Sequence, residues 1–205
     1  MNNEGKRVER QEPAGQPQKK EKMTLKRFWK EWREVILILA AVFVVFKFIL
    51  QIAWVPSGSM ETTLPVRSVL IGWQLTYLVA DPVPERGSVV TFWSDELNKV
   101  LVKRVIGLPG DAVSFADGYV YVNGQQQEEA YLPAQGITDC TDTFQVPEGH
   151  IFVLGDNRTG SFDSRFWNDP YVPINQIQAK PFLVISLGKN QSWQGVRLIE
   201  QGGNA

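Results

Sequence analysis

The distribution of apolar and polar residues divides the chain into three parts. Residues 1–34 are mostly polar, residues 35–55 are apolar except for Lys47 and Gln51, and residues 56–205 alternate short apolar runs with turn-forming residues. A helix over 35–55 would be about 30 Å long, which matches the apolar thickness of a bilayer. The pattern therefore predicts one transmembrane helix at 35–55, and it disfavours a buried core helix or a cleaved signal peptide.

The flanks of this apolar segment predict its orientation. Trp29 and Trp32 precede it and Trp54 lies at its far end, which are positions typical of interfacial aromatic residues. Residues 1–34 contain ten Lys or Arg against six Glu, so the positive-inside rule predicts a basic cytoplasmic tail. Residues 56–205 would then be extracytoplasmic. Lys47 would extend its long side chain toward the outer interface.

The pattern after residue 55 is typical of β structure. Short β-branched or aromatic runs are bounded by Gly, Pro, Asp and Asn, and they predict strands at 68–75, 88–93, 99–106, 112–115, 119–122 and 150–154. Asp117 and Gly118 predict a hairpin turn between two of these strands, and Asn123 and Gly124 predict the next turn. The sequence thus indicates a mainly β domain that follows a membrane helix.

Composition and charge exclude several classes of protein. One Cys (Cys140) and one His (His150) allow no intrachain disulfide and no Cys/His zinc site of the usual ligand number, and no cofactor motif is present. The net charge of -1 argues against a nucleic-acid binder. That charge divides into +4 over residues 1–34 and -5 over residues 35–205, so the chain is polarised rather than neutral.

A serine activated by a lysine remains as candidate hydrolase chemistry. His150 follows a turn, VPEG, where a solvated loop histidine is the simpler interpretation. The string Ser186 to Lys189 fits S-x-x-K, but it lies in a strand and turn without the helix that such a motif uses, and we interpret it as fortuitous.

A second serine and lysine have more promising surroundings. The turn PSGSM (56–60) directly follows the apolar segment and exposes hydroxyl groups. In a strand, Lys103 would share a face with Leu101 and Val105, which would desolvate its amine and lower its pKa. A shift from about 10.4 to about 8 corresponds to roughly 3 kcal/mol. Taken singly, these segments and the polar loop 155–165 are more simply interpreted as a polar turn, an edge-strand lysine and a solvated loop.

Together and in this order, the apolar segment, PSGSM, VKRVIGLPGD and GDNRTGSFDSR resemble type I signal peptidase, the membrane-bound leader peptidase of the Ser-Lys class. The resemblance covers about residues 35–187. It implies a β-rich signal-peptidase-type catalytic domain over 56–205, with a variable β extension at about 112–147 that lies away from the dyad.

The resemblance assigns roles to individual residues. Ser59 matches the nucleophile and Lys103 the general base. Ser57 matches the residue whose hydroxyl joins the Ser59 backbone N–H in the oxyanion hole, and Ser161 matches the serine that orients the lysine amine.

Five further residues match supporting positions of the family. They are a packing residue beside the nucleophile and two expected ion pairs, and we interpret them as structural: Met60, Arg104 with Asp156, and Asp163 with Arg165. The resemblance implies no metal and no cofactor.

The function implied is removal of N-terminal signal peptides from exported preproteins, by cleavage after a small-x-small motif through an acyl-enzyme. The partners implied are preprotein signal peptides and the lipid bilayer, with the export translocon as a further candidate. The plasma membrane is the expected location, and a thylakoid or other organelle membrane is the alternative. Two other functions stay open: a narrower Ser-Lys maturation protease for one exported factor, and a pseudoenzyme that binds signal peptides without cleavage.

Overall fold

The structure is a computed structural model that describes residues 25–187 and 195–202. The chain divides into a unit that ends at Ala40 and a larger unit that begins at Ala41. The helical elements are α1 (Leu25–Val44), a π-helical turn η1 (Val45–Ile49), a 3-10 turn η2 (Gly58–Met60), α2 (Leu75–Val79) and a 3-10 turn η3 (Ile174–Gln176). All other elements are strands, which agrees with the predicted mainly β class.

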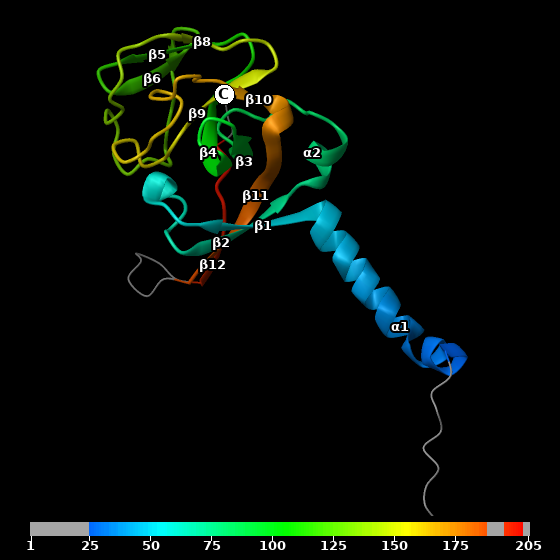
Figure 1. Ribbon diagram of the computed structural model, residues 1–205. Helices are drawn as coiled ribbons and strands as arrows, with labels where there is room; N and C mark the ends of the chain where they lie inside the picture. The colour runs from blue at the N-terminus through cyan, green and yellow to red at the C-terminus, as the bar shows by residue number, and fades with distance from the viewer. Residues whose placement is uncertain (1–24, 188–194, 203–205) are drawn as a thin grey trace, which may run out of the picture. The chain divides into compact units, whose positions relative to one another are not determined.

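The larger unit contains two antiparallel sheets (Figure 1). The large sheet has the order β1-β2-β11-β3-β4-β9-β10, and β12 pairs with β11. Its strands are β1 (Leu50–Val55), β2 (Ser68–Trp73), β3 (Val89–Ser94), β4 (Lys99–Gly107), β9 (His150–Leu154), β10 (Val172–Pro173), β11 (Ile177–Ser186) and β12 (Gly195–Leu198). The small sheet has the order β7-β6-β5-β8, from β5 (Ala112–Ala116), β6 (Tyr119–Val122), β7 (Gln125–Gln126) and β8 (Phe144–Gln145).

All six predicted strands are present, as β2, β3, β4, β5, β6 and β9. The first is shorter than predicted because α2 begins at Leu75. Both predicted turns are confirmed. Asp117 and Gly118 have φ values of 51° and 80°, and Asn123 and Gly124 have 53° and 79°. Two successive left-handed residues match the twist of the paired strands that they join.

The predicted helix over 35–55 is wrong over its last six residues, 50–55. Helical structure ends at Ile49, and β1 follows at once and pairs with β2 from Leu50 to Val55. Gln51 explains the change, because its side chain bonds Gln178 at 2.9 Å and the Thr91 hydroxyl at 2.5 Å across the sheet. The exposed Ile52 and Trp54 alternate with the less exposed Gln51, Ala53 and Val55, which is the period of a strand.

The loss of residues 50–55 from the helix shortens the apolar helical segment. Over residues 25–187 and 195–202, the structure has no helix that is both long enough and apolar enough for a membrane crossing.

Three buried apolar clusters hold the larger unit together. One lies under β3, β4 and β9, and includes Phe92, Val105 and Trp167. A second joins the small sheet to β4 and β9 through residues such as Val113 and Phe152. The third cluster contains Met60 of the PSGSM turn. It is packed against residues from several strands and loops: Val55, Leu64, Leu70, Val89, Val184 and Ile199. The turn that carries the predicted nucleophile is therefore anchored on both sides by buried side chains.

Candidate active site

The PSGSM turn is tied to the polar loop 155–165. Ser57 has an extended backbone, and η2 begins at Gly58. The Asn157 side chain donates to the Gly58 carbonyl at 2.9 Å, and the Asn157 N–H donates to the Ser59 carbonyl at 3.0 Å. The buried Met60 accepts a hydrogen bond from the Asp156 N–H at its sulfur atom. These contacts fix the backbone around Ser59.

Lys103 lies on β4 with its side chain almost fully buried, at 2% exposure. Its amine donates to the Ser161 hydroxyl over 2.9 Å. Burial lowers the pKa of Lys103 to about 8, because the charged amine loses its hydration. The carboxylates of Asp163 and Asp156 oppose this shift, whereas the positive charges of Arg165 and Lys99 add to it. A neutral amine is thus accessible near physiological pH.

Gly155 allows the PSGSM turn to lie close to Ser161, the residue that accepts the Lys103 hydrogen bond. A Cβ atom at this position would lie 2.2 Å from the Ser161 hydroxyl and 2.5 Å from the Ser59 carbonyl oxygen. Both distances are far below van der Waals contact, so only glycine fits. The Ser161 hydroxyl and the Ser59 carbonyl therefore both border the space that a side chain at position 155 would fill.

The two supporting pairs are both present and buried. Arg104 binds Asp156 through two hydrogen bonds of 2.9 and 2.7 Å, with both side chains inaccessible to solvent. The Asp163 carboxylate accepts from Arg165 at 2.8 Å and from the Gly155 N–H at 2.9 Å. The loop 155–165 is thus held by charge-assisted hydrogen bonds on both sides of Ser161.

Ser59 and Lys103 are not joined directly. Over the part of the chain that the structure describes, no hydrogen bond links their side chains, and the Lys103 amine donates to Ser161 instead. The Ser161 hydroxyl and the Ser59 backbone carbonyl both lie close to Gly155. Catalytic hydrogen bonds often form only in the substrate complex, so a missing bond is compatible with the pair that the resemblance implies.

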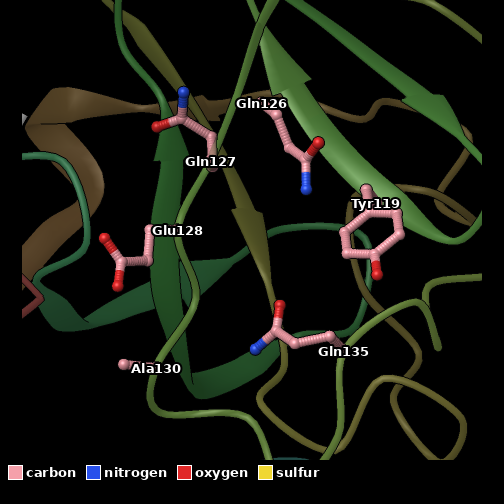
Figure 2. Close-up of a pocket in the computed structure, with 6 residues that line it drawn as sticks. All are labelled: Tyr119, Gln126, Gln127, Glu128, Ala130 and Gln135. Atoms are coloured by element: carbon pink, nitrogen blue, oxygen red, sulfur yellow. The ribbon is translucent and has the colours of Figure 1, made fainter.

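A pocket of about 320 Å³ opens beside the PSGSM turn. It is lined by residues 51–57 of β1 and the turn, by Ser59 and Met60, and by residues 99–102 of β4. Another pocket, of about 380 Å³, lies on the extension around Tyr119 and several Gln side chains, and it contains none of the predicted site residues (Figure 2). Among the described residues, no group of three His, Cys, Asp or Glu could hold a metal ion.

Comparison with known proteins identifies the family. The family model described as signal peptidase, peptidase S26, matches residues 29–186. The chain belongs to this signal peptidase family. This confirms the resemblance inferred from the sequence motifs.

Named relatives are signal peptidases as well. The chain is 37% identical over 142 residues to a probable signal peptidase I-2 of Synechocystis, covering 66% of this chain and 63% of the relative. It is 31% identical over 183 residues to signal peptidase I of Pseudomonas fluorescens, covering 70% and 64%. It is 33% identical over 159 residues to signal peptidase I S of Bacillus subtilis, covering 72% and 84%. The chain thus spans less than two thirds of the first two relatives.

Several residues of the candidate site carry no signal in the sequence that singles them out. Gly155 and Asn157 lay within the polar loop, but their individual contacts depend on the distant PSGSM turn. Thr63, whose hydroxyl bonds Asp156, had no distinguishing pattern. Glu129 and Tyr131 lie in the predicted extension, yet they contact Arg158 and Arg104. Only the folded chain brings these segments together.

The buried pair Arg104–Asp156 leads to a stability prediction. Asp156→Asn leaves a buried guanidinium without its counter-charge, and we expect the free energy of unfolding to fall by about 3–5 kcal/mol. Urea denaturation measures this loss. The matched control is Glu85→Gln in the exposed pair Lys180–Glu85, which should change the free energy of unfolding little. Equal effects of the two substitutions would contradict the prediction.

Proposed function

We propose that this chain is a membrane-bound serine endopeptidase that removes N-terminal signal peptides from exported preproteins. Ser59 acts as the nucleophile and Lys103 as the general base. The observation that carries the proposal is the buried Lys103 amine, held by Ser161 and connected through Gly155 to the Ser59 turn beside a pocket. Family membership supports the same reaction class.

The reaction divides into acylation and deacylation. The neutral Lys103 amine takes the proton of the Ser59 hydroxyl while the serine oxygen attacks the scissile carbonyl carbon. Lys103 then gives this proton to the leaving amine as the C–N bond breaks, which leaves an acyl-enzyme on Ser59. In deacylation a water molecule attacks the ester, with Lys103 again as base. The signal peptide departs with a new carboxyl group.

Two groups beside the nucleophile are suited to stabilise the oxyanion. The Ser57 hydroxyl and the Ser59 backbone N–H belong to the same turn, and both residues line the pocket. We propose that they donate to the carbonyl oxygen as negative charge develops on it. The contacts of Asn157 with Gly58 and Ser59 support this role, because they pre-organise the turn before substrate binds.

The pocket accounts for a small-x-small preference. A substrate bound in an extended conformation directs alternate side chains to the same side, about 6.6 Å apart. The first and third residues before the scissile bond then point into the pocket between β1 and β4, and the middle residue points away. A volume of about 320 Å³ shared by backbone and two side chains favours small residues at both positions.

We further propose that the N-terminal segment anchors the enzyme to a lipid bilayer. Many large apolar side chains of α1 and η1 are exposed, among them Leu37, Ile38 and Phe43 at 62–63%. Such a surface is unusual for a protein in water and suits a lipid environment. Residues 1–34 would be a basic cytoplasmic tail and residues 56–205 the extracytoplasmic catalytic domain, with 112–147 as a variable extension. The membrane is the plasma membrane, or a thylakoid or other organelle membrane, and the export translocon is a candidate neighbour.

For the proposed function, the first prediction concerns Ser59 and Lys103. With a preprotein in detergent or lipid, Ser59→Ala and Lys103→Met should each reduce cleavage to background, a loss of at least about 1000-fold, because they remove the nucleophile and its base. Release of the mature protein is followed on gels and by mass spectrometry. Ser114→Ala and Lys180→Ala are the matched controls and should retain activity. Uncleaved but bound preprotein in the wild type would indicate a pseudoenzyme.

The second prediction concerns pH. Only the neutral amine accepts a proton, so a pKa of about 8 places half of Lys103 in the active form at that pH. We expect kcat/KM to fall about tenfold for each pH unit below this midpoint and to level off above it. Single-turnover cleavage from pH 6 to 10 measures the profile. A constant rate across that range would argue against Lys103 as the base.

The third prediction concerns anchoring. The double substitution Ile38→Arg and Val42→Arg places two charges in the apolar segment, at a cost of roughly 2.5–3.5 kcal/mol each in a bilayer. We expect this variant to move from the membrane pellet to the supernatant after carbonate extraction. Lys30→Gln in the same helix is the control and should stay in the pellet. Soluble wild-type protein would refute the anchor.

A further inference from the structure

The connection between β7 and β8 contributes a buried carboxylate to the neighbourhood of the active site. Glu129 is 3% exposed, and Arg158 of the loop 155–165 is 2% exposed. Arg158 donates to both Glu129 carboxylate oxygens, one of them at 2.9 Å, and to the Thr138 hydroxyl at 2.6 Å. Residues 129–139 therefore close over this arginine from the side of the extension.

Tyr131 links the same segment to the strand that carries Lys103. Its hydroxyl donates to Glu129 at 2.7 Å, and the Arg104 guanidinium lies 3.8 Å from the centre of its ring. Burial raises the pKa of Tyr131, so the phenol stays a neutral donor. Arg104 follows Lys103 directly in β4 and pairs with Asp156. The ring thus covers a buried ion pair adjacent to the lysine.

Arg158 also contacts the residues around Ser161, and so it links them to Glu129. It donates to the Gly155 carbonyl at 3.2 Å, and its own carbonyl accepts from Arg165 at 2.8 Å. Arg165 in turn pairs with Asp163. Ser161 lies between these fixed points, so the loop geometry that presents its hydroxyl to Lys103 depends on where Arg158 is held.

We propose that Glu129 and Tyr131 are positioning residues for the Lys103–Ser161 pair, and that they act through Arg158 and Arg104. The segment 129–139 is then part of the active-site support, although the sequence predicts it to belong to an extension away from the dyad. The catalytic meaning of this role rests on the proposed function, in which Lys103 is the base.

A positioning role and a merely structural role differ in their effect on Lys103. The charged groups that act on its amine are Asp163, Asp156, Arg165 and Lys99. Glu129 is not among them, and a direct loss of its negative charge would lower the Lys103 pKa. A loosened loop admits water to the amine and raises the pKa toward its ordinary value. A structural role would reduce stability and leave the Lys103 pKa unchanged.

The experiment is an NMR titration of the full-length protein with 13C-labelled lysine, in which the Lys103 Cε signal is assigned by its absence from Lys103→Met. We expect Glu129→Gln to move the Lys103 midpoint upward by about one pH unit. The matched control is Glu128→Gln, the neighbouring exposed residue, which should titrate like the wild type. Thermal unfolding confirms that each variant is folded at the titration temperature.

Tyr131→Leu is the second variant and decides the outcome if Glu129→Gln does not fold. It removes both the hydroxyl and the ring beneath Arg104, and we expect the same upward movement of the Lys103 midpoint. A folded Tyr131→Leu or Glu129→Gln protein whose midpoint is equal to or lower than that of Glu128→Gln overturns the proposal. The titration needs no substrate, so a wild-type chain that cleaves no preprotein would refute the proposed function alone.

Discussion

The buried amine of Lys103 is the constraint on which the rest of the site depends. An ammonium group loses several kcal/mol of hydration when it leaves water, and it needs either a counter-charge or the freedom to become neutral. A direct carboxylate partner would keep it charged, and a charged amine could not serve as the base in the proposed mechanism. The site instead offers Lys103 a hydroxyl, that of Ser161, which can bond the amine in either protonation state.

The neighbouring arginines explain why Lys103 bonds a hydroxyl rather than a carboxylate. Among the described residues, each buried guanidinium around the site has its own acidic partner: Arg104 with Asp156, Arg165 with Asp163, and Arg158 with Glu129. The carboxylates of Asp156 and Asp163 are therefore each bonded to an arginine, which cannot release a proton, and the Lys103 amine bonds Ser161 instead. Arginine also fixes two carboxylate oxygens at once, so these pairs define the shape of the loop as well as its charge.

The sequence predicted what depends on local pattern. Lys103 between Leu101 and Val105 indicated a buried amine, and the turns at Gly118 and Gly124 followed from residues that tolerate a positive φ. The apolar segment 35–55 predicted secondary structure less well, because the composition of β1 is that of the helix before it. Only the pairing of β1 with β2 and the side-chain contacts of Gln51 show that residues 50–55 form a strand. Glu129 and Tyr131 carried no signal, since their partners lie about 30 residues away in the chain. Interactions of that separation leave no periodicity in a single sequence.

The direct junction of η1 and β1 limits the distance between the apolar helix and Ser59. No loop separates Ile49 from Leu50, and β1 is a paired strand of six residues, about 20 Å long. Ser59 follows a short turn beyond it. The spacing between the apolar helix and the proposed nucleophile is therefore set by a rigid strand rather than by a tether of variable length. An insertion of one residue between Gln51 and Val55 would lengthen this spacer and reverse the facing of the residues on one side of it, so Gln51 and Val55 would no longer point to the same face.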